Sequence, residues 1–201
     1  MSFSAEPRWN ALLPPLGDRL QRRGVVADVF VVGGAAMALA YDAKRVTRDI
    51  DATFVSHGVV VEEARRAADA LGLPYWWLNE QASIYISGKD DPGKRRVFAH
   101  PGLRVSAASP AHVFAMKALA ARTRDIDDLR VRADIIGVES ADEALQICRG
   151  LLSGRTSART LCRCAARALR VSTLPTRTGT SSTVTADGLS DWPSHILRRS
   201  Q

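Results

Sequence analysis

Two short stretches decide the fold of this chain: Val-Val-Gly-Gly-Ala-Ala at residues 31–36 and Thr-Arg-Asp-Ile-Asp at residues 47–51. The first predicts an apolar strand that ends in paired glycines and leads into a short helix of small residues. The second places Asp49 and Asp51 at the beginning of another apolar stretch. Because alternate residues of a strand point to the same side, we expect the two carboxylates to project together, with Ile50 turned into the core.

This arrangement of carboxylates and glycines predicts a site for a nucleotide and its metal. Two carboxylates that converge on one point repel each other unless a cation lies between them. Mg²⁺ is the usual cation, because it takes one or two carboxylates and completes its shell with water and phosphate oxygens. We therefore expect Asp49 and Asp51 to be metal ligands. Gly33 and Gly34 lack Cβ atoms, so backbone N–H groups can approach a triphosphate where the next helix begins.

Each stretch taken alone has a simpler interpretation. A Gly-Gly pair after an apolar strand is more often a tight turn, and Asp-x-Asp is more often a solvated edge or a helix cap. Their order along the chain favours the joint site, because the glycines end one strand and the acidic residues lie on the next. The stretch is not a dinucleotide fingerprint, since Val-Gly-Gly-Ala-Ala-Met lacks the Gly-x-Gly-x-x-Gly spacing.

A third stretch lies further along the chain, in a region with helical periodicity. It reads Ala-Met-Lys-Ala-Leu-Ala-Ala-Arg at 115–122, followed by Arg-Asp-Ile-Asp-Asp-Leu at 124–129. Lys117 has mostly apolar neighbours, so its stem can be buried while its ammonium reaches a site; the alternative is that it extends to solvent. Asp125 and Asp128 are three residues apart and share a helix face, although Asp125 could serve only as a helix-terminal acid.

In this order, the three stretches resemble the minimal nucleotidyltransferases of the DNA polymerase β superfamily. Within that superfamily they are most similar to the AbiEii-like branch, which includes the MenT-type toxins, over residues 28–145. The resemblance implies a Mg²⁺-dependent enzyme that transfers NMP from an NTP to the 3′ end of tRNA. It also implies the toxin of a toxin–antitoxin pair, held in check by a cognate antitoxin protein.

The resemblance also implies roles for individual residues. Lys117 matches a functional lysine, and Asp128, ahead of Asp125, matches the last acid of an Asp-x-x-Asp element that orients the lysine or the incoming hydroxyl. Thr47 matches a Ser/Thr position expected to bond a phosphate, where phosphorylation would block triphosphate binding; the alternative is that it only caps the strand. Arg48 is a further candidate for nucleotide binding, although strand alternation turns it away from Asp49.

One departure from the superfamily concerns a third carboxylate, which many members carry on a later strand. The natural place for it here, Leu103 to Ser106, contains no acidic residue. This departure puts a polymerase-like general base in doubt, and it fits the reduced AbiEii-like pattern.

The fold class expected from these patterns is α/β (α+β), a minimal nucleotidyltransferase fold with a mixed sheet flanked by helices and followed by a helical C-terminal part. We expect a core at 1–108, a helical part at 109–152 that completes the active site, and a basic Ser/Thr/Arg-rich tail at 153–201. Within the tail, residues 157–171 could form one helix, and the composition of the remainder predicts disorder.

Apolar periodicity and turn residues predict the individual elements. Ser109-Pro110 and the Ser140/Glu143 capping box are expected to begin two of the helices. Gly and Pro at 88–93 predict a hairpin between strands at 82–86 and 97–99. The expected helices are 16–23, 34–41, 59–71, 110–122, 125–136 and 140–151, and the other expected strands are 29–32, 50–55 and 103–106.

The composition of the chain indicates its cellular compartment and argues against contact with a membrane or with zinc. The chain has 201 residues, 46% of them hydrophobic, and lacks both an eighteen-residue apolar run and a signal-peptide pattern, so we expect a cytoplasmic protein without membrane contact. Three cysteines without a nearby histidine or second pair argue against zinc.

The net charge of +7 is concentrated near the C-terminus. Eight arginines oppose two aspartates beyond residue 154, which leaves 20 basic against 19 acidic residues before it. RNA binding would therefore rely on a patch of Lys89, Lys94, Arg95 and Arg96 and on an arginine stripe at 159–170, for which a solvated face is the alternative. Two other functions stay open: nucleotidyl transfer to a protein or small molecule, and a non-catalytic nucleotide- or RNA-binding regulator.

Overall fold

The structure, a computed structural model, describes residues 11–41, 47, 49–120 and 125–152, without the side chains of Ile126 and Asp127. Arg48 and the expected helix at 157–171, with the rest of the tail, lie outside the described residues.

Five strands form one mixed sheet in the order β3-β2-β1-β5-β4. The central strand β1 runs parallel to β5 and antiparallel to β2, while β2 is parallel to β3 and β4 is antiparallel to β5. Together with the flanking helices, this mixed sheet confirms the expected α+β class. The strands are β1 (Ala27–Val31), β2 (Ile50–Phe54), β3 (Leu78–Asn79), β4 (Arg95–His100) and β5 (Leu103–Ala107).

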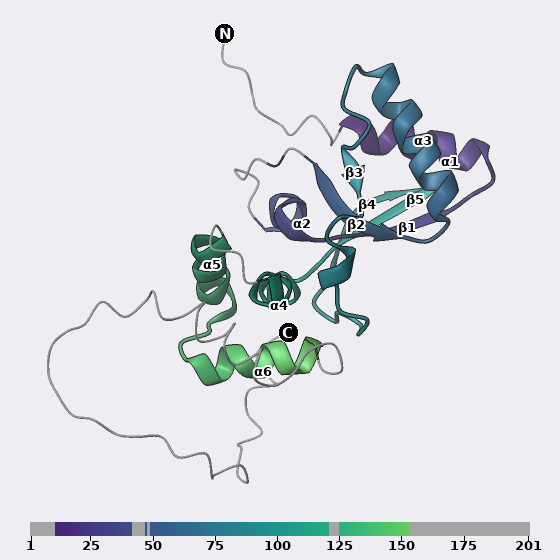
Figure 1. Cartoon of the computed structure of the whole chain (residues 1–201). Coiled ribbons are helices and arrows are strands. Elements are labelled where there is room, and N and C mark those ends of the chain that lie inside the picture. The colour runs from purple at the N-terminus through teal and green to yellow at the C-terminus, as the bar shows by residue number, and fades with distance from the viewer. Residues whose placement is uncertain (1–10, 42–46, 48, 121–124, 153–201) are drawn as a thin grey trace, which may run out of the picture.

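One face of the sheet is buried and the other is partly open. On β1 the residues alternate between buried Ala27, Val29 and Val31 and more exposed Asp28 and Phe30, and β5 repeats this pattern. The buried face belongs to the main core, which also contains apolar residues of α1 (Leu13–Arg22) and α3 (His57–Ala70). Figure 1 shows these two helices packed together on the same side of the sheet.

The remaining helices provide the site and a second core. α2 (Gly33–Ala40) directly follows β1, and its small residues allow close packing on β2 and β5. Figure 1 shows α4 (Pro110–Ala120), α5 (Ile126–Ile136) and α6 (Ala141–Leu152) grouped away from α1 and α3. They enclose a separate apolar cluster, and α4 contributes residues to both clusters.

Two of the expected helix starts are observed as local hydrogen bonds. Ser109 Oγ accepts the N–H of His112 at 3.1 Å, and Ser140 Oγ accepts the N–H of Glu143 at 3.2 Å. The carboxylate of Glu143 accepts the N–H of Glu139 rather than that of Ser140, so only half of the expected capping box forms.

The predicted hairpin between 82–86 and 97–99 is wrong. Residues Ser83–Tyr85 form a short 3₁₀ helix, because the N–H groups of Ser83 and Tyr85 bond locally to carbonyls of Glu80 and Ala82. β4 pairs instead with β5, which follows it after a two-residue turn. The strand missed by the sequence pattern, β3, has only two residues and therefore shows no periodicity.

The helices are short compared with the thickness of a bilayer. The longest one in the described residues, α3, has 14 residues, whereas a spanning helix needs about 20. None of the described helices is long and apolar enough to cross a membrane.

Candidate active site

A cavity of about 300 Å³ lies where β2, the beginning of α2 and the middle of α4 meet. It brings together residues that are far apart in the sequence, among them five of the predicted site residues. The lining residues are Gly33, Gly34, Asp49, Asp51, Gln81, Ala82, Tyr85, Val113, Met116, Lys117, Ala120 and Asp125.

The two carboxylates enter this cavity from the beginning of β2. The peptide group of Asp51 is fixed by the N–H of Val32, which donates to its carbonyl at 2.8 Å. Asn79 is the register partner of Asp51 on β3, and its Nδ2 donates to Asp49 Oδ2 at 3.0 Å. Asn79 therefore holds one of the two carboxylates. Sequence reasoning missed this residue, because a single polar residue after Leu78 gives no pattern.

The paired glycines leave space for this arrangement. Gly33 has φ +66°, and a Cβ on it would lie 3.5 Å from Asp51 Oδ2. A Cβ on Gly34 would lie 3.5 Å from Thr47 Oγ1. No side chain caps the beginning of α2, so its first N–H groups are not bonded by a capping residue and the positive end of the helix dipole faces the cavity region.

Lys117 reaches the cavity from α4 and is held by two carboxylates. Its Nζ lies 2.6 Å from Asp125 Oδ1 and 2.9 Å from Asp128 Oδ2, and its side chain is only 16% exposed. Asp125 lines the cavity, whereas the Asp128 carboxylate contacts Lys117 and lies 3.5 Å from Nη1 of the buried Arg132. The sequence-based preference for Asp128 over Asp125 is thus not reflected in the geometry, since both acids contact the lysine.

The hydroxyl of Thr47 donates to the carbonyl of Asp49 at 3.1 Å and lies close to Gly34. This hydrogen bond stabilises the turn that leads into β2, and Thr47 does not line the cavity. A phosphate role for Thr47 remains a prediction.

The third carboxylate comes from an unexpected element. β5 contains no acidic residue, as its sequence indicated, but Asp125 at the beginning of α5 joins Asp49 and Asp51 in the lining of the cavity. Asp125 is paired with the ammonium of Lys117, so its charge environment differs from that of Asp49 and Asp51.

The donor set fits a magnesium ion that is also held by phosphate. No group of three or more His, Cys, Asp or Glu side chains is arranged to hold a metal within the part of the chain that the structure describes. Two carboxylates in one cavity match the small number of protein ligands that Mg²⁺ takes when substrate phosphates complete its shell. Asp49 and Asp51 are the residues that would hold it.

Three of the four residues in the expected RNA-binding patch already have partners. Lys89 donates to the carbonyl of Gly150 at 2.7 Å, and Lys94 pairs with Asp90 at 2.6 Å. Arg95 donates to the carbonyl of Ala40 at 3.1 Å and lies over the ring of Tyr41. Arg96 makes no hydrogen bond or short ion pair with any described residue. Of these partners only Asp90 carries an opposite charge, so the contacts fix the side chains and neutralise one of the four cations.

Comparison of the chain with protein-family models, with curated proteins and with solved structures finds no match.

Proposed function

We propose that this protein is a Mg²⁺-dependent nucleotidyltransferase that transfers NMP from an NTP to the 3′ end of tRNA. The observation that supports it best is the single cavity that contains the glycine pair, the two carboxylates of β2 and the ammonium of Lys117. In the reaction, the acceptor hydroxyl oxygen forms a bond to the α-phosphorus, the bond to pyrophosphate breaks, and the hydroxyl proton leaves to solvent.

Each protein group has a task in this reaction. The N–H groups at Gly33 and Gly34 bind phosphate oxygens, because a helix N-terminus favours anions. Lys117 neutralises negative charge on the triphosphate, and Asp125 and Asp128 fix the position of its ammonium. Asn79 orients Asp49. Tyr85 lines the same cavity and offers an aromatic ring to the base.

The metal would be held by Asp49 and Asp51. When bound, Mg²⁺ supplies positive charge to the phosphates and the departing pyrophosphate. Metal binding can be tested without activity, by titration with Mn²⁺ followed by electron paramagnetic resonance. We expect Asp51→Asn to weaken Mn²⁺ binding at least tenfold, whereas Asp69→Asn on the exposed side of α3 leaves it unchanged. Equal binding by both variants would rule out this metal site.

The activity test is incubation of the purified protein with total tRNA, Mg²⁺ and each α-³²P-labelled NTP separately. We expect label in tRNA with the wild type and with Asp69→Asn, and a loss of at least a hundredfold with Asp51→Asn and Lys117→Met. Transfer of label from only one of the four NTPs would also identify which base the enzyme prefers. EDTA should stop the reaction in every case.

Other outcomes point to the alternatives. Label in protein or in a small molecule, with none in tRNA, would show that the acceptor is that molecule and not tRNA. If no NTP is transferred by the folded protein but nucleotide still binds, the chain is a non-catalytic regulator.

The resemblance of the three stretches to AbiEii-like toxins extends the proposal to a growth-arresting toxin with a cognate antitoxin. Induced expression tests this role: the wild type should stop growth and Asp51→Asn should not. Normal growth with abundant wild-type protein would contradict it.

A further inference from the structure

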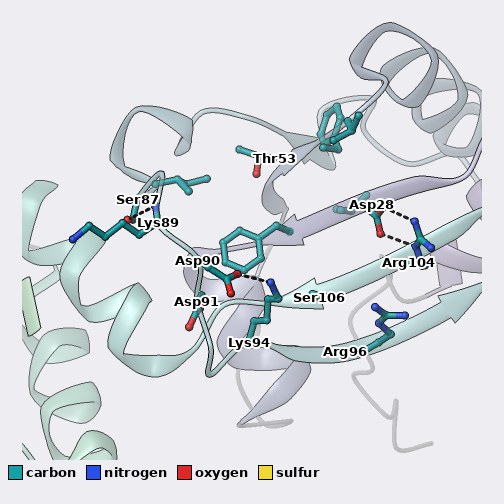
Figure 2. Close-up of a pocket in the computed structure, with 15 residues that line it drawn as sticks. Asp28, Thr53, Ser87, Lys89, Asp90, Asp91, Lys94, Arg96, Arg104 and Ser106 are labelled. Carbon is teal, nitrogen blue, oxygen red and sulfur yellow. Dashed lines mark hydrogen bonds and ion pairs between the residues drawn. The ribbon is translucent and has the colours of Figure 1, made fainter. Parts of the chain in front are cut away.

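A second cavity, of about 500 Å³, lies on the open face of the sheet. Strand residues form its floor, and the segment 86–94 forms a wall (Figure 2). Among the floor residues, Arg96, Ser106, Phe30 and Thr53 are successive register partners on β4, β5, β1 and β2. Strands lie about 4.8 Å apart, so this row crosses about 14 Å of the sheet. The cavity is thus an elongated trough and not a closed pocket.

The trough adjoins the candidate active site along two separate segments. On β2, Asp51 lines the active-site cavity and Thr53 lines the trough, on the same face of the strand. Two residues of a strand rise about 6.6 Å, so the trough begins one side chain away from the carboxylates. In the opposite wall, Tyr85 lines the active-site cavity and the next residue, Ile86, lines the trough. The two cavities are therefore neighbours, as a linear molecule that reaches both would require.

Two of the four cations that line the trough are paired with carboxylates. Arg104 Nε and Nη2 donate to Asp28 at 2.7 and 2.5 Å, and Lys94 pairs with Asp90 at 2.6 Å (Figure 2). The carboxylate of Asp91 accepts the N–H groups of Ser109 and Gly93 at 2.8 and 3.2 Å.

Arg96 stands apart from these pairs. It is exposed, and within the described residues it has neither a hydrogen bond nor a short ion pair. Figure 2 shows it projecting to the same side of the sheet as Arg104. Hydrogen bonds from Arg104 lower the pKa of Asp28, and the charge of Arg96 adds to this effect. The trough therefore presents an anion with one available guanidinium.

The other lining groups match a nucleotide unit. Phe30 on the trough floor is a partly buried aromatic ring, and such rings serve as stacking surfaces for bases in single-strand binding sites. Thr53 and Ser106 place hydroxyl groups on the same floor, where they can bond a ribose hydroxyl or a phosphate. A cation, an aromatic ring and hydroxyl groups in one trough are the combination that single-stranded RNA requires.

We propose that this trough binds the single-stranded RNA segment immediately preceding the acceptor 3′ end, with a backbone phosphate on Arg96. This proposal rests on the proposed nucleotidyl transfer. It places the terminal hydroxyl at Asp49 and Asp51 and the preceding nucleotides along the row from Thr53 to Arg96.

The test compares Arg96→Glu with Arg65→Glu, which makes the same charge change at an exposed position of α3, the helix that packs on the other face of the sheet. Binding of labelled total tRNA without NTP is measured by filter retention at several salt concentrations. The KM values for tRNA and NTP are measured separately. Ser106→Trp, which fills the trough, is the second variant, and thermal melting shows that each variant is folded.

We expect Arg96→Glu to weaken tRNA binding and raise the KM for tRNA about tenfold, with the KM for NTP within twofold of the wild type. The salt dependence of binding should fall by about 0.7 in the log–log slope, as for one lost phosphate contact. Ser106→Trp should raise the KM for tRNA similarly, and Arg65→Glu should change none of these values.

The outcomes separate this proposal from the proposed function. If the wild type transfers no label but Arg96→Glu alone weakens tRNA binding, the trough is supported and the transfer reaction is refuted. If the wild type labels tRNA and Arg96→Glu behaves like Arg65→Glu, the trough is refuted and the reaction stands. An equal rise in the KM for NTP would assign the trough to the nucleotide and overturn the proposal, as would an absence of tRNA binding by the wild type.

Discussion

At the scale of single residues, Gly33 and Gly34 are adjacent but have different constraints. Gly33 has φ +66°, a conformation in which an L-residue costs about 1–2 kcal/mol, whereas Gly34 does not have a positive φ. A Cβ on either one would meet its neighbour at 3.5 Å, an ordinary contact. The difference between the two positions is therefore backbone strain and not lack of space.

We expect Gly33→Ala to lower the free energy of unfolding by about 1 kcal/mol, because alanine is strained at this positive φ. Gly34→Ala should cause no loss, since alanine is favoured over glycine inside a helix. Urea denaturation of both variants measures the difference. Equal stability of the two would contradict the strain argument.

His112 is a second residue whose surroundings give a measurable effect. It is 1% exposed, its ring contacts Phe30 edge-to-face, and its Nδ1 lies 3.7 Å from Asp91 Oδ2. Burial lowers the pKa of His112, and the charge of Asp91 opposes this only in part. The folded protein therefore holds the imidazole neutral at pH values where the unfolded chain binds a proton.

Because the folded pKa lies below the ordinary value of 6.5, stability should be complete above that pH and fall as the pH decreases below it. One proton limits the slope to about 1.4 kcal/mol per pH unit. Urea denaturation between about pH 5 and 7.5 should show a smaller slope for His112→Gln than for the wild type. Identical slopes would show that His112 does not contribute to the pH dependence.

At the scale of elements, a buried carboxylate joins α1 to α3. The side chain of Glu63 on α3 is 3% exposed and lies 2.9 Å from Arg23 and 3.7 Å from Arg19. Arg66, one turn further on α3, contacts it at 2.8 Å. The neighbouring Glu62 contacts Arg23 and Arg66 as well, but it is 44% exposed. The two glutamates share two partners and differ in burial.

We expect Glu63→Gln to lower the free energy of unfolding by about 2–3 kcal/mol, because it leaves arginines around a buried position without their counter-charge. Glu62→Gln should cost less than about 0.5 kcal/mol, since water screens exposed pairs. Urea denaturation compares them. A loss at Glu62 as large as that at Glu63 would show that burial does not decide the strength of these pairs.

At the scale of the whole molecule, α4 joins the two cores. Val113 and Met116 belong to the core of the sheet, and Phe114, Ala115 and Ala118 belong to the cluster formed with α5 and α6. Lys117 lies on the same helix, so the position of its ammonium depends on both cores. Ser87 and Lys89 add a second connection, as they donate to the carbonyls of Leu151 and Gly150 at the end of α6.

We therefore expect the described part of the chain to unfold in one cooperative transition. Phe114→Ala, at a position with no exposure, should lower the free energy of unfolding by about 3–5 kcal/mol. Its denaturation midpoint should fall equally by far-UV circular dichroism, which follows the helices, and by tryptophan fluorescence, to which Trp77 in the sheet-side core contributes. A lower midpoint by circular dichroism alone would show that the two cores unfold independently.

Local patterns in the sequence were sufficient to predict the class of fold, most helices and four of the five strands. The glycine pair, the Asp49/Asp51 spacing and the cap at Ser109 depend on neighbours within a few residues, so periodicity and capping rules apply to them. Helix periodicity also placed Asp125 and Asp128 on one face, while Lys117 and Asp128 were selected as site residues by the resemblance. The local rules failed at 82–86, where the turn residues at 88–93 led to the prediction of a hairpin strand and local hydrogen bonds form a 3₁₀ turn.

Only the tertiary structure decided which distant residues meet. The contact of Asn79 with Asp49, the approach of Asp125 to the cavity and the row from Arg96 to Thr53 all depend on strand register and helix packing. Register is set by the burial of one whole sheet face, an interaction between residues far apart in sequence. The sequence by itself therefore indicated which groups are available for chemistry, and long-range packing determined which of them lie in the same cavity.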